Sequence, residues 1–210
     1  MTVKAPNPEV TIWSVNKSSR GGVSPGLIVL HTTEGSNVPH SIQDLVGLGN
    51  FFNTPSVQAS SHVANDGDGH DARYVADEDK AWTCANANPF TLNIEQIGFA
   101  KTTRDEWYKL YSHQLANTAR WIAYWGAKYN IPLRRGVAPA GYLIRKGVAS
   151  HKQLGISGGG HWDPGPSYPM KYVILMARYF TAKDRGHKAQ AEKLAKRINR
   201  IRRRYNLKEL

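Results

Sequence analysis

The chain has 210 residues, a hydrophobic fraction of 40% and six tryptophans, which is enough for one packed globular domain and excludes a disordered chain. No apolar run approaches the roughly 18 residues of a membrane span, and the N-terminus has no apolar stretch typical of a Sec-type signal peptide. The single cysteine, Cys84, excludes an internal disulfide.

The net charge of +12 is concentrated near the C-terminus. Residues 183–210 contain eleven Lys or Arg and three acidic residues, a net charge of +8, which leaves +4 for the first 182 residues. We therefore divide the chain into a main domain at 1–182 and a basic tail at 183–210.

Short apolar segments in the first half of the chain predict strands and one helix. Turn-rich sequence separates the first two strands, and glycines in NDGDGHD predict a hairpin between the next two. Apolar spacing over 41–52 predicts a helix. The predicted strands are 9–13, 27–31, 60–64, 73–76 and 93–99.

Longer helical patterns follow. Apolar residues at helical spacing over 104–129 predict one long helix, which the sequence Asn-Ile-Pro at 130–132 ends. Residues 134–160 are Gly-rich and irregular, and Pro169 suits the first turn of a helix through MKYVILMARYF. This mixture of strands and helices favours an α/β sheet covered by helices.

Three residues form a candidate metal-binding set. His31 ends an apolar strand, whereas His151 and Asp163 lie in the Gly-rich region. Two imidazoles and one carboxylate suit zinc and leave a fourth position open. The spacing alone is weak, because any one histidine could instead be a surface or capping residue.

Four segments together resemble the N-acetylmuramoyl-L-alanine amidase family, the zinc amidase fold shared with phage lysozyme-amidases and peptidoglycan recognition proteins. They are LIVLHTTEG, SSHVANDGDG, AWTCANANPFTLNIEQIGF and SHKQLG…HWDPGPSYPM. The likeness spans about residues 26–179, in the family's order. It implies a central mixed β-sheet flanked by helices, a Zn²⁺ cofactor in a groove at one sheet edge, and hydrolysis of the amide between muramic acid and L-alanine in peptidoglycan.

The resemblance also implies roles for single residues. His31, His151 and Asp163 match the metal ligands, and Glu95 matches an acidic residue that exchanges a proton with the attacking water. Some members carry Tyr there, and without the resemblance Glu95 reads as an exposed strand residue. His161 stands where the family often has Lys, a cation that stabilises the oxyanion. Its alternative role is a further imidazole ligand to zinc.

The resemblance places Trp82, Asn86 and Asn88 where the family shapes the substrate cleft. His62, on a predicted strand, is expected to line the same groove. A structural histidine is the equal alternative for His62, and a core position is the alternative for Trp82. We interpret Cys84 as a small buried residue, because no Cys-His motif accompanies it.

The basic tail has its own pattern. Leu194, Ile198, Ile201 and Tyr205 recur at helical spacing, and cations fill the other positions. Either this helix docks its apolar stripe on the domain and leaves a solvated basic face, or that face binds an anionic wall polymer or membrane surface. Nucleic acid lacks a supporting motif, and we expect a monomer.

The preferred function is a phage endolysin in host lysis, held in the host cytoplasm until release to the cell wall, with antimicrobial action. A cytoplasmic peptidoglycan-recycling amidase also fits the signal-less N-terminus. Rivals from other classes are a non-catalytic peptidoglycan-binding module and a cationic protein that permeabilises membranes through its tail.

Overall fold

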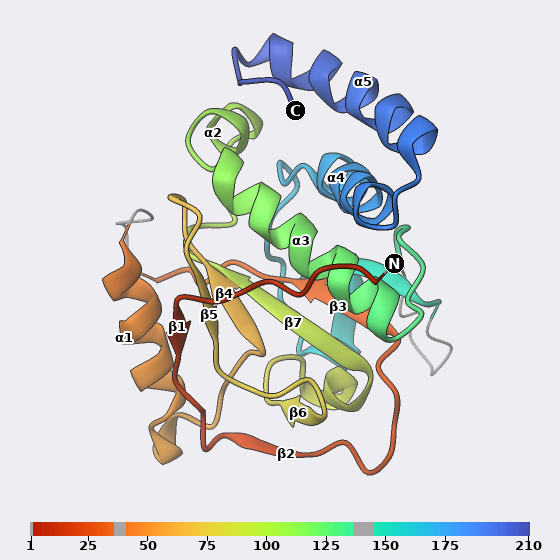
Figure 1. The fold of residues 1–210 in the computed structure, drawn as a ribbon. Coiled ribbons are helices and arrows are strands. Elements are labelled where there is room, and N and C mark those ends of the chain that lie inside the picture. The colour runs from red at the N-terminus through yellow and green to blue at the C-terminus, as the bar shows by residue number, and fades with distance from the viewer. Residues whose placement is uncertain (1, 36–40, 137–144) are drawn as a thin grey trace.

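A six-stranded mixed sheet forms the centre of the protein in a computed structural model that describes residues 2–35, 41–136 and 145–210 (Figure 1). Its order is β1-β5-β4-β7-β3-β8, and all neighbours pair in parallel except β4 with β5. A separate two-stranded sheet pairs β2 with β6. The strands are β1 (Val10–Thr11), β2 (Lys17–Ser19), β3 (Leu27–Leu30), β4 (Val63–Asn65), β5 (Asp71–Arg73), β6 (Asp79–Ala81), β7 (Thr91–Gln96) and β8 (Gly147–Ser150). The predicted mixed sheet is confirmed.

Helices cover both faces of the sheet (Figure 1). The α-helices are α1 (Ile42–Phe52), α2 (Arg104–Lys109), α3 (Ser112–Lys128), α4 (Met170–Asp184) and α5 (Lys188–Arg204). The 3₁₀ helices are η1 (Pro55–Val57), η2 (Ala85–Phe90) and η3 (His151–Gly158). Helices α3 and α4 share the main core with the sheet, α5 packs on α4, and α1 packs on β1 and β5.

The central strand β3 is buried on both faces, which explains its uninterrupted apolar sequence LIVL. Ile28 and Leu30 point into the core under α3 and α4. Leu27 and Val29 point the other way, where they meet Leu154. Because side chains alternate along the strand, His31, the next residue, points to the same face as Leu27 and Val29.

The single helix predicted over 104–129 is wrong. It is two helices, because the chain leaves helical geometry at Tyr111, with φ −115° and ψ 24°. The break orients α2 so that Trp107 is fully buried, with its ring centroid 4.9 Å from that of Tyr168. Apolar spacing continues across the break, so periodicity could not reveal it.

Three strands were not predicted. β8 lies inside the stretch taken as irregular, part of which falls outside the described residues, and β2 and β6 are short and polar. β8 begins at Gly147, where an added Cβ would lie 2.5 Å from the Arg134 carbonyl oxygen. Only glycine permits that close approach.

The basic tail forms α5, whose apolar stripe contacts the rest of the protein. Leu194 and Ile198 are buried, and Tyr205 stacks on Tyr108 with ring centroids 4.1 Å apart. Burial of such side chains stabilises the docked helix by roughly 1.5–3 kcal/mol each. In the part of the chain that the structure describes, no helix is long and apolar enough to cross a membrane.

Candidate metal and catalytic site

Three neighbouring parallel strands carry the candidate site to one edge of the sheet. His31 directly follows β3, His151 directly follows β8, and Glu95 is the penultimate residue of β7. The carboxyl ends of parallel strands meet at the same edge, where α/β proteins commonly bind ligands. All three residues line a cleft of about 390 Å³.

The predicted metal ligands lie together in this cleft. The two Nδ1 atoms of His31 and His151 are 3.0 Å apart. The Asp163 carboxylate is 3.3 Å from His31 Nδ1 through Oδ2, and 3.1 Å from His151 Nδ1 through Oδ1. Ligands at tetrahedral positions about 2.0 Å from zinc are roughly 3.3 Å apart, so the three groups are spaced to hold one.

Hydrogen bonds outside the trio fix how both imidazoles are protonated. His31 Nε2 lies 3.1 Å from Asn93 Oδ1, and His151 Nε2 lies 2.8 Å from the carbonyl oxygen of Gly158. Because these oxygens only accept, each Nε2 carries the proton and each Nδ1 presents a lone pair. Two lone pairs and the Asp163 carboxylate therefore converge, and such a set needs a cation between its members.

A proton is poorly suited to be that cation. Burial lowers the pKa of His31, which disfavours its imidazolium form. Burial alone would raise the pKa of Asp163, but the imidazoles of His151 and His31 beside it lower the pKa overall and keep the carboxylate ionised. Neutral imidazoles beside an ionised carboxylate are the protonation states that zinc requires of its ligands.

Cys84 offers an alternative third ligand, since His31, Cys84 and His151 are also close enough to hold a metal. However, Cys84 Sγ lies 3.6 Å from His31 Nε2, the nitrogen opposite the one that faces Asp163, and it donates to Asn93 Oδ1 at 3.0 Å. Burial raises the pKa of the Cys84 thiol, so it stays protonated. The Asp163 set fits the metal better, and Cys84 is fully buried, as expected.

Glu95 is partly buried, and its buried Oε2 has no hydrogen-bond partner within the described residues. Burial, together with the charges of Asp163 and Glu34, raises the pKa of Glu95 to about 8. A carboxyl that titrates near neutral pH can both accept and donate a proton, as a general acid–base must.

His161 is exposed at the cleft, and its ring stacks on that of His151 with centroids 4.4 Å and planes 10° apart. One of its nitrogens lies within 4.8 Å of ligand atoms of both His151 and Asp163. The position is therefore compatible with either predicted role, oxyanion stabilisation or metal ligation.

The predicted substrate contacts lie in different places. Trp82 lines the cleft, and its Nε1 donates to Ser18 Oγ at 3.0 Å. Asn86 is exposed on η2 but is not among the described residues that line the cleft. His62 does not reach the cleft, because it is fully buried and its Nε2 lies 2.7 Å from Arg20 Nη2. His62 therefore takes the structural role that was its alternative.

Asn93 is a functional residue that sequence reasoning missed. It orients His31 through Oδ1 and lies two residues before Glu95 on β7, hence on the same face of the strand. That spacing was a usable signal. No sequence signal identifies the Gly158 carbonyl, because its position depends on a tight turn. A Cβ added at Gly158 would lie 2.6 Å from Leu154 Cβ.

Several solved structures share this fold. The hydrolase AmiA of Staphylococcus aureus, solved with its ligand, is 21% identical, with a TM-score of 0.63 and 87% of both chains covered. An AmpD derivative is 18% identical, with a TM-score of 0.58 over 86% of this chain and 99% of the other. The endolysin amidase LysCS of Clostridium intestinale is 17% identical, with a TM-score of 0.54 over 81% and 95%. No curated protein matches.

The sequence model of the N-acetylmuramoyl-L-alanine amidase family matches residues 21–166, so the chain belongs to that family. It hydrolyses the amide bond between N-acetylmuramic acid and L-alanine in bacterial peptidoglycan. Enzymes of this family are typically zinc-dependent.

Proposed function

We propose that this amidase works with one zinc ion held by His31, His151 and Asp163. The observation that carries the proposal is the convergence of two Nδ1 lone pairs and one carboxylate within 3.3 Å, with both Nε2 atoms committed elsewhere. Zinc bound there supplies Lewis-acid chemistry, which polarises the scissile carbonyl and makes a water nucleophilic near neutral pH.

The protein's own groups then move the proton and steady the charge. Glu95, which lines the cleft, takes a proton from the attacking water and passes it to the nitrogen of the leaving L-alanine. An N–H of His161 stabilises the developing oxyanion. Trp82 forms part of the cleft wall that positions the substrate.

Zinc content tests the proposed ligands. His31→Ala should bind no zinc by elemental analysis, whereas His70→Ala should bind about one ion per chain, as the unaltered protein should. His70 is a suitable control because it does not line the catalytic cleft and its Nδ1 pairs with the Asp66 carboxylate. Stoichiometric zinc and full activity in His31→Ala would remove His31 from the site.

The biological role that we propose is phage endolysin, held in the host cytoplasm until release. Similarity in fold to an endolysin amidase supports it. Mass spectrometry of digests should detect new L-alanine amino termini from intact cross-linked sacculi. Activity on soluble muropeptides alone would favour the recycling amidase, and lysis of cells treated from outside would show antimicrobial action.

The exposed face of α5 is a second element of the proposal, as a surface attracted to an anionic wall polymer or membrane. Lys193, Lys196 and Arg200 are exposed while the apolar stripe of the helix is buried. We propose that the enzyme acts as a monomer, which sedimentation of the full chain would check.

A further inference from the structure

A second cleft, of about 380 Å³, lies behind the segment that supplies Asp163. His161 and Asp163 line the catalytic cleft, whereas Trp162 and Pro164 line this one, because alternate residues of an extended segment point to opposite sides. The same holds at the end of β8, where His151 faces the first cleft and Lys152 faces the second.

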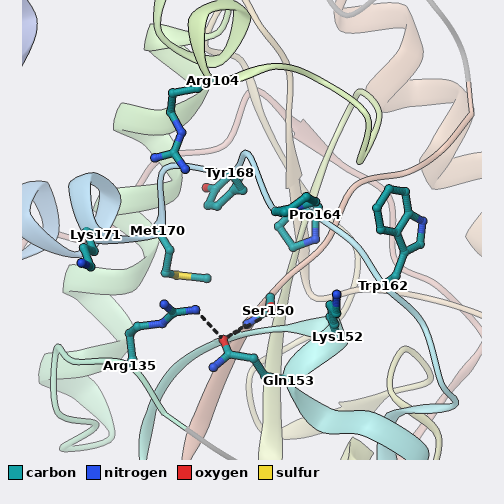
Figure 2. Close-up of a pocket in the computed structure, with 12 residues that line it drawn as sticks. Arg104, Arg135, Ser150, Lys152, Gln153, Trp162, Pro164, Tyr168, Met170 and Lys171 are labelled. Atoms are coloured by element: carbon teal, nitrogen blue, oxygen red, sulfur yellow. Dashed lines mark hydrogen bonds between the residues drawn. The ribbon is translucent and has the colours of Figure 1, made fainter.

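Four cations surround the second cleft, which we call the basic cleft. Figure 2 shows Arg104, Arg135 and Lys171 on one side of it and Lys152 on the other. All four side chains are exposed, and none forms an ion pair with a described residue. Arg135 Nη2 has only a long contact, 3.5 Å, with Gln153 Oε1. Like charges left this close without acids repel one another and favour binding of an anion.

The basic character continues into an adjoining cleft of about 410 Å³, which shares Arg104, Arg135 and Lys171 with the first. Three more cations line this second part, namely Arg134, Arg178 and Arg197. Among the described residues that line the two clefts there is no Asp or Glu. The first turn of α4 also lacks an acidic residue and instead places Lys171 there, beside the positive end of the helix dipole.

We propose that the two adjoining clefts form a binding site for a phosphodiester-containing anionic polymer of the cell wall. Seven cations over two clefts exceed what the few carboxylates of a stem peptide would occupy, and they match a chain of repeated charges. The exposed indole of Trp162, 51% accessible, adds an apolar surface for the polymer's sugar or polyol units. The site rests on the proposed wall-lytic function and would hold the enzyme on the wall with the catalytic cleft next to it.

Cosedimentation with purified, lipid-free walls tests the site. The full-length protein is mixed with walls that keep their phosphodiester polymers and with walls stripped of them by hydrofluoric acid. The double variant Arg135→Gln/Lys171→Gln removes two cations shared by both clefts. We expect its Kd for unstripped walls to rise about tenfold at low salt, since cations near an anionic surface contribute additively, and we expect no change on stripped walls.

Two controls separate the site from general charge and from misfolding. Lys4→Gln/Lys101→Gln loses the same charge from exposed positions outside both clefts and outside α5, and it should keep its affinity for unstripped walls. Arg135→Lys/Lys171→Arg keeps the charge and should restore binding. Turnover of soluble muropeptides should be the same for all variants, so a failure of the amidase itself would be seen separately.

Several results would overturn the proposal. One is unchanged binding of Arg135→Gln/Lys171→Gln to unstripped walls, and another is an equal loss in the Lys4→Gln/Lys101→Gln control. Equal binding to stripped walls would assign the cations to peptidoglycan carboxylates. Loss of binding only on phosphatidylglycerol vesicles would assign them to a membrane, and loss only on duplex DNA to nucleic acid.

Discussion

The catalytic cleft and the basic cleft lie on opposite sides of residues 161–164. Their polar and charged groups differ in how many hydrogen-bond partners they have. In the catalytic cleft, buried acceptors converge, and a second hydrogen bond orients each of the two imidazoles, as Asn93 orients His31. In the basic cleft, exposed cations stand apart with few partners. The first arrangement fixes a small cation with high geometric precision, whereas the second suits an extended anion that can adapt. The predictions below test whether chemistry and attachment are separate in this way.

The largest effect is expected from Glu95→Gln. The amide keeps the shape of the side chain but cannot accept a proton, so turnover should fall about 10²- to 10⁴-fold on intact walls and on soluble muropeptides alike. Zinc should be retained. Glu34→Gln is the matched control, because Glu34 lines the same cleft but accepts hydrogen bonds from Thr32 Oγ1 and the Ala100 amide. Near-normal rates in Glu95→Gln would make it a structural residue.

His161→Ala should lower turnover by about 10- to 10³-fold while zinc content stays unchanged, if its N–H stabilises the oxyanion. His161→Lys, which restores the residue type expected from the family, should recover much of the rate. Loss of zinc from His161→Ala would instead identify His161 as a ligand. Binding to walls should not change in either variant, because His161 faces only the catalytic cleft.

Asn93→Ala removes the acceptor that fixes the protonation of His31. Zinc affinity should fall about 10- to 100-fold, the usual effect of losing such a partner. Asn86→Ala, at an exposed position on η2, serves as the control and should leave zinc affinity unchanged. Competition with a chelator of known affinity measures both. Equal affinities would mean that packing alone orients His31.

A smaller effect concerns stability and pH. In metal-free protein the pKa of Glu95 is raised to about 8, whereas the unfolded chain titrates near 4.5. Between these values unfolding releases a proton, so the free energy of unfolding falls as pH rises from about 5 to 8. Glu95→Gln should remove this slope and gain on the order of 1–3 kcal/mol relative to the unaltered protein at pH 8. Urea unfolding from pH 5 to 9 would show it, and parallel curves for the two proteins would contradict it.

The sequence predicted the catalytic cleft far better than the basic cleft, for a physical reason. His31 ends one predicted strand and Glu95 lies on another, and parallel strands bring their ends to one edge. The resemblance to the amidase family supplied the roles of both residues. Arg104, Lys152 and Lys171 come from separate elements, and no local pattern links them. Only the folded chain shows that they surround one space.

His62 shows the converse limit. Its segment predicted a strand beside the cleft, but strand β4 begins only at Val63, and His62 turns inward to Arg20. Alternation gives the face of a residue only within a strand, and His62 lies just before the first residue of β4.

The zinc content of two variants, Asp163→Ala and Cys84→Ala, tests the central claim most directly. His31 and His151 belong both to the proposed set with Asp163 and to the alternative set with Cys84, so only the third ligand distinguishes them. The proposed site predicts that Asp163→Ala binds no zinc after dialysis, while Cys84→Ala keeps about one ion per chain. Zinc retained in Asp163→Ala and lost in Cys84→Ala would contradict the account and place the metal on the other side of the His31 ring.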